Sequence, residues 1–437
     1  MNKYNCIWIM CDQLPGYALS CNGDKNVRTP NIDLLSQMGI NFENAVGGFP
    51  LCCPCRGSIL TGVYPHKCVP GHEYQLPPKQ QTIADVFNDN GYHTAYVGKW
   101  HLDGFHEDTG RAAKHIVPKE RRGGFNYWVG YENNNSQWDC YVHGGDETGE
   151  IPLTKLQGYE TDALTDIFLE HLESIDKENP FFAVLSVQPP HDPYIAPAEY
   201  MQRFSPAAIK LRDNVPNVEW VTKLARQELA GKYAMIENLD YNVGRIVNWL
   251  RENKLIENTH IIFFSDHGDM NGSHGLFRKM VPYEESVKVP FIISGATPYY
   301  DDWKTGNVSI PLNHVDIAPT TLGLCGIGTP EFMSGTDCSS LRMPADVKSG
   351  LPEAAYLQAV IPTGHHHSEE YPWRGILTED GYKYVAFEHM PWLLFDLNTD
   401  PYEQVNLAHN TKYKDLRIKM EEKLKHFIKE TDDNFEL

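Results

Sequence analysis

The sequence lacks the features that mark several large classes of protein. No apolar run approaches the roughly 18 residues that a membrane-spanning helix needs. The ten cysteines are too sparse in a chain of 437 residues to indicate a disulfide scaffold. Positive charge is scarce, because 38 Lys and Arg residues stand against 58 Asp and Glu residues, a net charge of −20 at pH 7. We therefore expect neither nucleic acid nor a membrane as a partner, and an anionic substrate needs a local cluster of cations.

A signal for export is also missing at the N-terminus. The apolar stretch before Asp12 is short, and it lacks the long apolar region and the small-residue cleavage site of a signal peptide. We interpret this stretch as the first strand of the fold. Most cysteines are then expected to be free thiols in a reducing compartment, and the expected location is the cytoplasm.

Apolar runs and helical stretches alternate along the chain. The composition, with 41% hydrophobic and 22% charged residues, is that of a globular protein. The apolar runs are residues 6–10, 94–98, 181–187, 260–265 and 290–294. Most of them are almost continuously apolar, as strands covered on both faces are. The pattern predicts an α/β fold in which helices wrap both faces of a mostly parallel sheet.

A second, smaller unit is predicted at the C-terminal end. The Ser- and Pro-containing stretch at 338–352 indicates a linker. Short strand-like runs and a final amphipathic helix follow it, at residues 375–377, 382–387, 392–397 and about 413–430. We therefore divide the chain into an α/β domain at 1–345 and an α+β subdomain at 346–437 that borders the site. The histidine run at 365–367 is expected in a polar loop at the rim.

Polar side chains follow four of the predicted strands. They are Asp12 with Gln13, Lys99 with His101, His191 with Asp192, and Asp266 with His267. Because ligands bind beyond the carboxyl ends of parallel strands, these side chains are expected to meet at one edge of the sheet. A single acid there is more often a turn or a helix cap. Four strand ends together supply carboxylate, amide and imidazole ligands for a metal, and cations for an anion.

Cys52 is predicted at the start of a helix. Pro54 fits the first turn of a helix that runs to about Thr61. An oxyanion beside Cys52 would be stabilised by the positive end of the helix dipole and by free backbone N–H groups. Arg56 lies one turn further along on the same side, so it can bind an oxygen attached to Cys52.

The pattern Cys52-x-Pro54-x-Arg56, followed by Leu60-Thr61-Gly62, closely resembles the signature of the type I sulfatases of the alkaline phosphatase superfamily. In that family the first cysteine is converted to Cα-formylglycine. Further runs match family motifs in order, at residues 98–102, 190–194, 265–268 and 395–406. One such motif alone is weak evidence, but the ordered set covers essentially the whole chain.

The resemblance implies a role for each candidate residue. It implies that a divalent metal is bound by the converted Cys52 together with Asp12, Gln13, Asp266 and His267. It implies that Arg56 orients the aldehyde hydrate and that cations and imidazole surround the sulfate, from Lys99, His191 and Lys279. His101 is the expected base for the second hydroxyl of the hydrate. The acid for the leaving group is either His191 or Lys279.

The implied chemistry needs both oxygens of the hydrate. One attacks the sulfur of the ester and displaces the alcohol, so that the sulfuryl group is carried on residue 52. Deprotonation of the other oxygen then expels sulfate and regenerates the aldehyde. The implied partners are a small sulfate ester and, transiently, a formylglycine-generating maturase. Ca²⁺ is the expected metal by family analogy. Mn²⁺ stands close behind because one ligand is an imidazole, and Mg²⁺ and Zn²⁺ are further alternatives.

Three positions depart from the usual family pattern. Gln13 stands where a second Asp is usual, and His267 stands where Asn is usual. Both are similar to the choline-sulfatase and phosphonate-monoesterase branch, although Lys99 and His101 are sulfatase-like. The third is Cys55, where serine is common.

The sequence therefore predicts a sulfuric ester hydrolase acting on a small carbohydrate sulfate or an aryl or steroid sulfate. The loop at 103–158, rich in aromatic and polar residues, serves either kind of substrate. Two alternatives stay open: a phosphonate monoester or phosphodiester hydrolase, and an anion-binding protein in which Cys52 is never converted. A zinc site built from Cys52, Cys53, Cys55 and Cys68 lacks a second cysteine pair or a histidine pair, so Cys53 and Cys55 are interpreted as packing thiols.

Overall fold

The computed structural model of the protein describes residues 3–296, 303–344, 350–362 and 369–437. The predicted histidine loop at 365–367 lies outside these residues. Within them, no helix combines the length and the apolar character that crossing a membrane requires.

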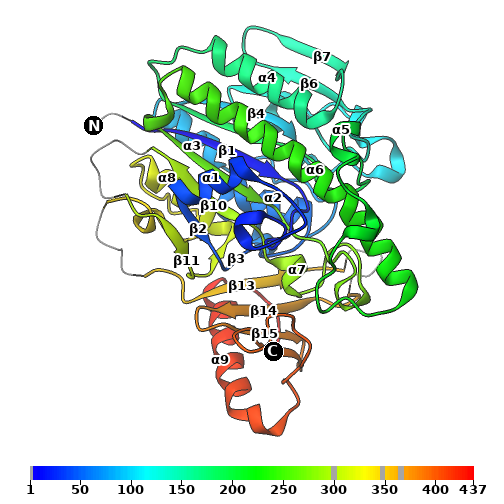
Figure 1. The fold of residues 1–437 in the computed structure, drawn as a ribbon. Helices are drawn as coiled ribbons and strands as arrows, with labels where there is room; N and C mark the ends of the chain where they lie inside the picture. The colour runs from blue at the N-terminus through cyan, green and yellow to red at the C-terminus, as the bar shows by residue number, and fades with distance from the viewer. Residues whose placement is uncertain (1–2, 297–302, 345–349, 363–368) are drawn as a thin grey trace.

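A ten-stranded sheet forms the centre of the molecule (Figure 1). Its middle consists of four neighbouring parallel strands, in the order β9 (Thr259–Ser265), β1 (Asn5–Cys11), β8 (Phe181–Ser186) and β4 (His93–Lys99). These four are the first four predicted runs, within two residues at each end.

The flanks of the sheet contain the antiparallel pairs. β10 (Phe291–Gly295), the fifth predicted run, pairs antiparallel with β9. The other flanking strands are β2 (Ile40–Phe42), β11 (Gly306–Val308), β5 (Tyr127–Tyr131), β6 (Tyr141–Gly145) and β7 (Glu150–Lys155). β2, β6 and β7 also form antiparallel pairs. The predicted α/β class is confirmed, with a parallel centre and mixed flanks. A separate short pair joins β3 (Ala45–Val46) and β12 (Leu312–Asn313).

Helices cover both faces of the sheet (Figure 1). The apolar residues of β1 alternate: Ile7 and Ile9 pack toward α1 (Pro30–Met38), α4 (Glu160–Ser174) and α6 (Glu219–Glu252). Trp8 and Met10 pack toward α2 (Cys52–Thr61), α3 (Ile83–Asp89) and α8 (Ile317–Leu324). The short helices are α5 (Ala198–Met201) and α7 (Glu284–Val287). The strands are thus buried on both sides, which explains their continuous apolar sequences.

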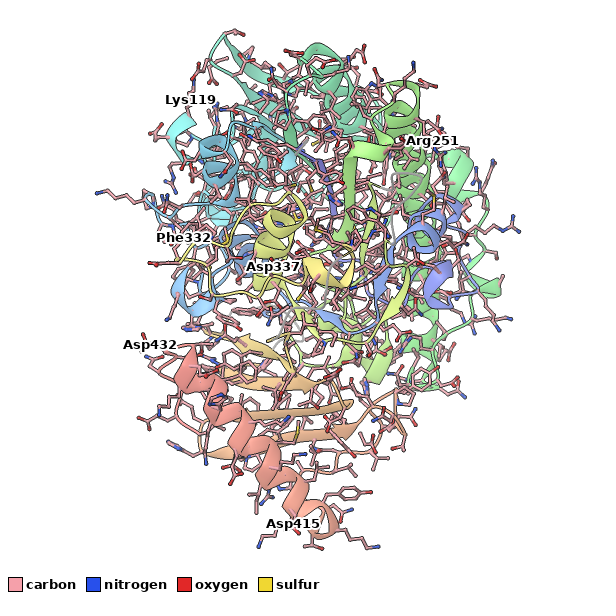
Figure 2. The ribbon with its side chains drawn as sticks, turned by 90° about the vertical axis from the view of Figure 1, so that its left-hand side faces the viewer. Lys119, Arg251, Phe332, Asp337, Asp415 and Asp432 are labelled. Carbon is pink, nitrogen blue, oxygen red and sulfur yellow. The ribbon has the colours of Figure 1, made fainter. Side chains whose placement is uncertain are left out.

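The C-terminal part is a four-stranded antiparallel sheet with one long helix. The strands are β13 (Ala354–Ala359), β14 (Trp373–Thr378), β15 (Tyr382–Phe387) and β16 (Met390–Asp396). α9 (Lys414–Glu430) lies against the outer face of this sheet, between the labelled Asp415 and Asp432 (Figure 2). The inner face packs on Phe49 and Leu51, and the N–H of Gln358 donates to the carbonyl of Gly48. The small sheet therefore supports the segment that leads to Cys52.

A buried carboxylate ties the chain end to this sheet. Asp433 accepts hydrogen bonds from Arg374 at 2.7 and 3.0 Å, from the Tyr356 hydroxyl at 2.8 Å and from Gln358 at 2.7 Å. Burial alone would raise the pKa of Asp433, but the Arg374 guanidinium holds it below its usual value. Its contribution to stability is therefore complete near neutral pH and is lost as the pH falls through that lowered pKa.

We expect Asp433→Asn to lower the free energy of unfolding by about 3 kcal/mol at pH 7, because Arg374 is then buried without a counter-charge. Urea unfolding at equilibrium measures the change. Asp432→Asn is the matched control, since the neighbouring Asp432 side chain is 93% exposed, and it should leave the unfolding free energy unchanged. Equal unfolding curves for the two variants would contradict the assigned role of Asp433.

Candidate active site

The candidate site lies where the four central parallel strands end. The register pairs Cys11 of β1 with Ser265 of β9, so the next residues, Asp12 and Asp266, lie side by side. On the other flank, Gly98 of β4 pairs with Ser186 of β8. Gly98 has a φ of 118°, and a Cβ there would lie 1.9 Å from the Ser186 carbonyl oxygen. Only glycine fits this approach of β4 to β8, which positions the following Lys99.

Cys52 is the first residue of α2, as predicted, and its side chain is buried. Its Sγ lies 3.1 Å from Nε2 of His267, 3.4 Å from Nζ of Lys279 and 3.7 Å from Oδ1 of Asp12. One cysteine is thus surrounded by an acid, an imidazole and an ammonium group that come from three different parts of the chain.

Arg56 joins the two buried carboxylates. Its Nη2 lies 3.1 Å from Oδ2 of Asp12, and its Nε donates to Oδ2 of Asp266 at 3.1 Å. Lys99 Nζ lies 2.7 Å from the same oxygen of Asp12. Burial would raise the pKa of Asp12, but Lys99 and the neighbouring cations hold it well below its usual value. Asp12 is therefore ionised at neutral pH despite being fully buried.

Four side chains form a group that can hold a metal ion. Asp12, Cys52, Asp266 and His267 each offer a ligand atom within 4.8 Å of the others. Nδ1 of His267 lies 2.9 Å from the Gly268 carbonyl oxygen, which can only accept, so Nδ1 carries the proton. Burial and the Lys279 charge lower the pKa of His267 to about 4. The neutral ring therefore presents the lone pair of Nε2 to this group.

The Gln13 amide lies beside this group. Its Oε1 accepts from Lys279 at 2.9 Å, and its Nε2 donates to Asp269 at 2.9 Å and to Asp192 at 3.1 Å. Gln13 has a φ of 64°, and His101, which follows β4, has a φ of 57°. Such left-handed conformations of non-glycine residues are costly and concentrate at functional sites.

His191 and Lys279 form a pair at the outer side of the group. Lys279 Nζ lies 3.0 Å from Nε2 of His191. Nδ1 of His191 lies 2.8 Å from the carbonyl oxygen of Asp192, so Nδ1 is the protonated nitrogen and Nε2 accepts from Lys279. Burial would lower the pKa of Lys279, yet Cys52 and nearby acids raise it, so this ammonium group stays charged.

His101 lies on the Lys99 side of the site. Its ring is buried and packs edge-on to His72, with centroids 5.8 Å apart. Burial and the Lys99 charge hold the pKa of His101 well below its usual value, so the ring is neutral. The other nine predicted residues form one contact network, and His101 adjoins it.

Sequence reasoning missed a second layer of the site. Lys232 of α6 is fully buried, and its Nζ lies 2.6 Å from Asp269 and 3.2 Å from the Gln13 carbonyl oxygen. The signal that could have found it is a lysine next to Tyr233 in the apolar stripe of that helix. Ser186, at the end of β8, was also missed; its Oγ accepts from Arg56 at 2.9 Å.

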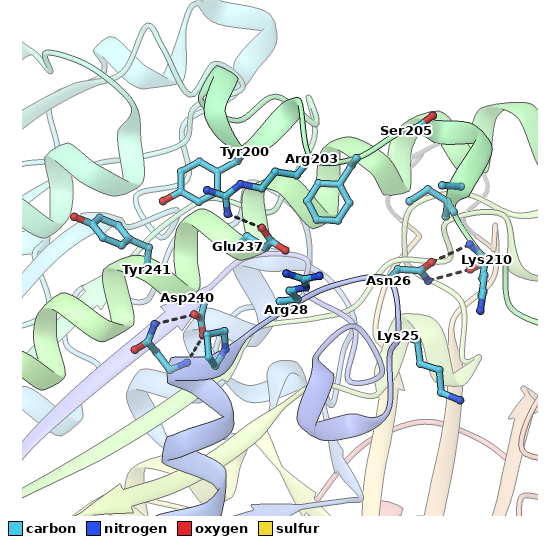
Figure 3. A pocket seen from close by; sticks show the side chains of 15 residues that line it. Lys25, Asn26, Arg28, Tyr200, Arg203, Ser205, Lys210, Glu237, Asp240 and Tyr241 are labelled. Atoms are coloured by element: carbon cyan, nitrogen blue, oxygen red, sulfur yellow. Dashed lines mark hydrogen bonds and ion pairs between the residues drawn. The ribbon is translucent and has the colours of Figure 1, made fainter.

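A pocket of about 710 Å³ lies elsewhere, between residues 25–31, residues 200–210 and α6 (Figure 3). Arg203 and Glu237 form an ion pair of 2.8 Å in it, and Asp240 accepts from the N–H of Asn31. None of the ten predicted site residues lines this pocket. The candidate site is thus separate from this pocket.

Comparison with known proteins identifies the family. Residues 4–327 match the family described as Sulfatase, and residues 272–430 match N-sulphoglucosamine sulphohydrolase, C-terminal. The chain is 36% identical to the Ulvan-active sulfatase of Formosa agariphila, over 99% of this chain and 82% of that protein. It is 26% identical to the N-acetylglucosamine-6-O-sulfatase of Bacteroides thetaiotaomicron, over 98% and 86% of the two chains. The crystal structure of yidJ from Bacteroides fragilis has a TM-score of 0.85 at 27% identity, covering 99% of this chain and 97% of that chain.

These matches confirm the resemblance that the motifs predicted. The Sulfatase match contains all ten predicted site residues, from Asp12 to Lys279. The match also spans the four parallel strands whose ends carry the site. The chain therefore belongs to the sulfatase family of the alkaline phosphatase superfamily, and it is an enzyme that hydrolyses sulfate esters.

Proposed function

We propose that the enzyme cleaves a sulfate monoester of a carbohydrate, with Cα-formylglycine made from Cys52 as the nucleophile and a divalent metal beside it. The observation that carries the proposal is the position of Cys52. It starts a buried helix and lies within 3.7 Å of Asp12, His267 and Lys279. Oxygens on the aldehyde carbon of the converted residue 52 would face acidic and imidazole ligands on one side and cations on the other.

The chemistry of the donor set fits a divalent cation. Asp12 and Asp266 supply carboxylates, and neutral His267 supplies Nε2. Gln13 lies next to them, since its backbone N–H donates to Oδ1 of Asp266 at 3.2 Å. When bound, the metal would lower the pKa of a hydroxyl on residue 52. Two carboxylates with one imidazole suit Ca²⁺ or Mn²⁺. Arg56 holds both carboxylates in place in either case.

The cations of the site are proposed to bind the sulfate group. Lys99 and Lys279 are both buried and both charged, because nearby acids raise the pKa of each against the effect of burial. Fixed charges in a buried site stabilise the charge that spreads over the sulfate oxygens in the transition state. Lys279 and His191 share one hydrogen bond, so we assign protonation of the leaving alcohol to this pair as a unit.

His101 is proposed as the base that removes a proton at residue 52. The base has to be neutral at the working pH, and the lowered pKa of His101 meets that condition. Its ring packs edge-on to His72, and its buried Nδ1 has no hydrogen-bond partner among the described residues.

A carbohydrate substrate is proposed over an aryl or steroid sulfate. The two relatives described above are named for ulvan and for N-acetylglucosamine 6-O-sulfate. In the loop at 103–158, Trp138 is 47% exposed, and its ring packs against Tyr159. An exposed aromatic ring of this kind suits the face of a sugar.

Conversion of Cys52 is tested by peptide mass spectrometry after co-expression with a maturase. We expect the mass change from thiol to aldehyde at Cys52 and turnover of sulfated saccharides. Cys52→Ala should lower that turnover about a thousandfold or more, because the nucleophile is lost. Cys55→Ser, which introduces the residue common in the family, is the control and should keep both conversion and turnover.

Two results would count against this proposal. An unmodified Cys52 beside an active maturase would favour a binding protein without a nucleophile. Conversion accompanied by turnover of a phosphonate monoester or phosphodiester, far above that of any sulfate ester, would assign the site to that chemistry instead.

The metal set is tested by His267→Asn, which restores the amide usual in the family. Removing an imidazole should weaken Mn²⁺ binding about tenfold while changing Ca²⁺ binding less, because Mn²⁺ accepts nitrogen ligands more readily. Calorimetric titration of the metal-free chain measures both affinities. Unchanged affinities for both metals would show that His267 is not a ligand, and an equal loss for both would contradict the expected preference for Mn²⁺.

A further inference from the structure

A second group of metal-binding side chains lies beside the candidate site. Cys53, His72 and His101 each offer one ligand atom, and these atoms lie within 4.8 Å of one another. Cys53 is fully buried and His101 is 3% exposed, whereas the His72 side chain is 23% exposed and forms the open side. The cysteine was interpreted from the sequence as a packing thiol because no histidine pair accompanied it. Folding supplies that pair.

The surroundings of these three side chains are typical of a metal site. Nδ1 of His101 is buried and has no hydrogen-bond partner among the residues that the structure describes. Nε2 of His72 lies 3.5 Å from Oε1 of Glu73, the carboxylate–histidine arrangement that orients a metal-binding ring. Burial raises the pKa of the Cys53 thiol, and the backbone N–H of Glu73 opposes that shift. The Glu73 carboxylate thus lies beside the ring of His72 at the open side of the group.

We propose that Cys53, His72 and His101 form a zinc-binding site, separate from the oxygen-rich group at Asp12 and Asp266. One thiolate and two imidazoles are a set that Zn²⁺ prefers over Ca²⁺, with water as the fourth ligand. Tetrahedral bonds of about 2.0–2.3 Å place ligands roughly 3.5 Å apart, so each donor has to move by less than about 1 Å. Binding forms a Zn–S bond and releases the thiol proton of Cys53, with no change of oxidation state.

Charges of both signs act on this site. Lys99 lowers the pKa of both His72 and His101, and Lys279 lowers that of His72, so both ammonium groups oppose the binding of a cation here. The thiolate that Cys53 forms on binding and the Glu73 carboxylate, 3.5 Å from Nε2 of His72, oppose that effect. The open side at His72 gives the ion a path from solvent.

Zinc at this site would inhibit the enzyme. This consequence rests on the proposed function, because it requires His101 to be the base at residue 52. A nitrogen lone pair held by zinc cannot accept a proton, and the ring is no longer free to adjust to the substrate. Binding itself does not depend on that role, so the two statements can be tested apart.

Binding is tested with Co²⁺, whose bond to a thiolate gives a charge-transfer absorption band. The full chain carries Cys52→Ser, so that no thiol remains in the group at Asp12. We expect the band in this chain, and we expect it to disappear when Cys53→Ser is added. Cys55→Ser, a buried thiol on the same helix outside the cluster, should leave the band intact. A missing band, or a band that survives Cys53→Ser, would overturn the site.

Zinc affinity and inhibition complete the test. Competition with a chromophoric chelator should show binding weakened roughly a hundredfold by Cys53→Ser or His72→Asn, and about tenfold by Glu73→Gln. Zn²⁺ should inhibit sulfate ester turnover by the converted enzyme, and Cys53→Ser should need at least about tenfold more zinc for the same inhibition. Zinc bound at Cys53 without any inhibition would overturn the inhibitory role. If the converted enzyme shows no sulfate ester turnover even when no zinc is added, that result would count against the proposed function instead.

Discussion

Two carboxylates, Asp12 and Asp266, are buried side by side, and the rest of the site depends on how their charge is neutralised. Isolated charges in a buried position cost several kcal/mol each, so both acids need partners. Arg56 reaches both of them, at 3.1 Å each. Because Arg56 lies one turn after Cys52 on α2, the same ion pairs that neutralise the acids fix the helix start, and with it Cys52, between the ends of β1 and β9.

Charge is balanced locally in a chain that is strongly acidic overall. Five carboxylates in the network, from Asp12, Asp192, Glu228, Asp266 and Asp269, are matched by five cations, from Arg56, Lys99, Lys232, Arg278 and Lys279. A divalent metal added to a balanced group leaves a positive charge there. An anionic ester is then attracted to this spot although the whole protein carries −20.

The sequence predicted those parts of the molecule whose residues are buried on both sides. The four central strands were found because double burial leaves continuous apolar runs, and their polar ends located seven of the ten candidate residues. Cys52 and Arg56 were located by the motif at the helix start, and Lys279 by the family resemblance alone. β7 was missed because all six of its residues are exposed, and β2 because it has three residues. The direction of β10 relative to β9 could not be predicted from the sequence, since the 25 residues between the two strands permit either orientation. His72 reaches the site only through long-range packing, which leaves no local pattern. Lys232 left only one local sign, a lysine within the apolar stripe of its helix.

The central claim is that Asp12, Asp266 and His267 form one metal site around residue 52. Anomalous diffraction at the manganese edge, from crystals of the full chain loaded with Mn²⁺, tests it most directly. The account predicts a peak bounded by the two carboxylates, Nε2 of His267 and residue 52. A chain that binds manganese elsewhere, with Asp12 and Asp266 still paired only to Arg56 and Lys99, would contradict it.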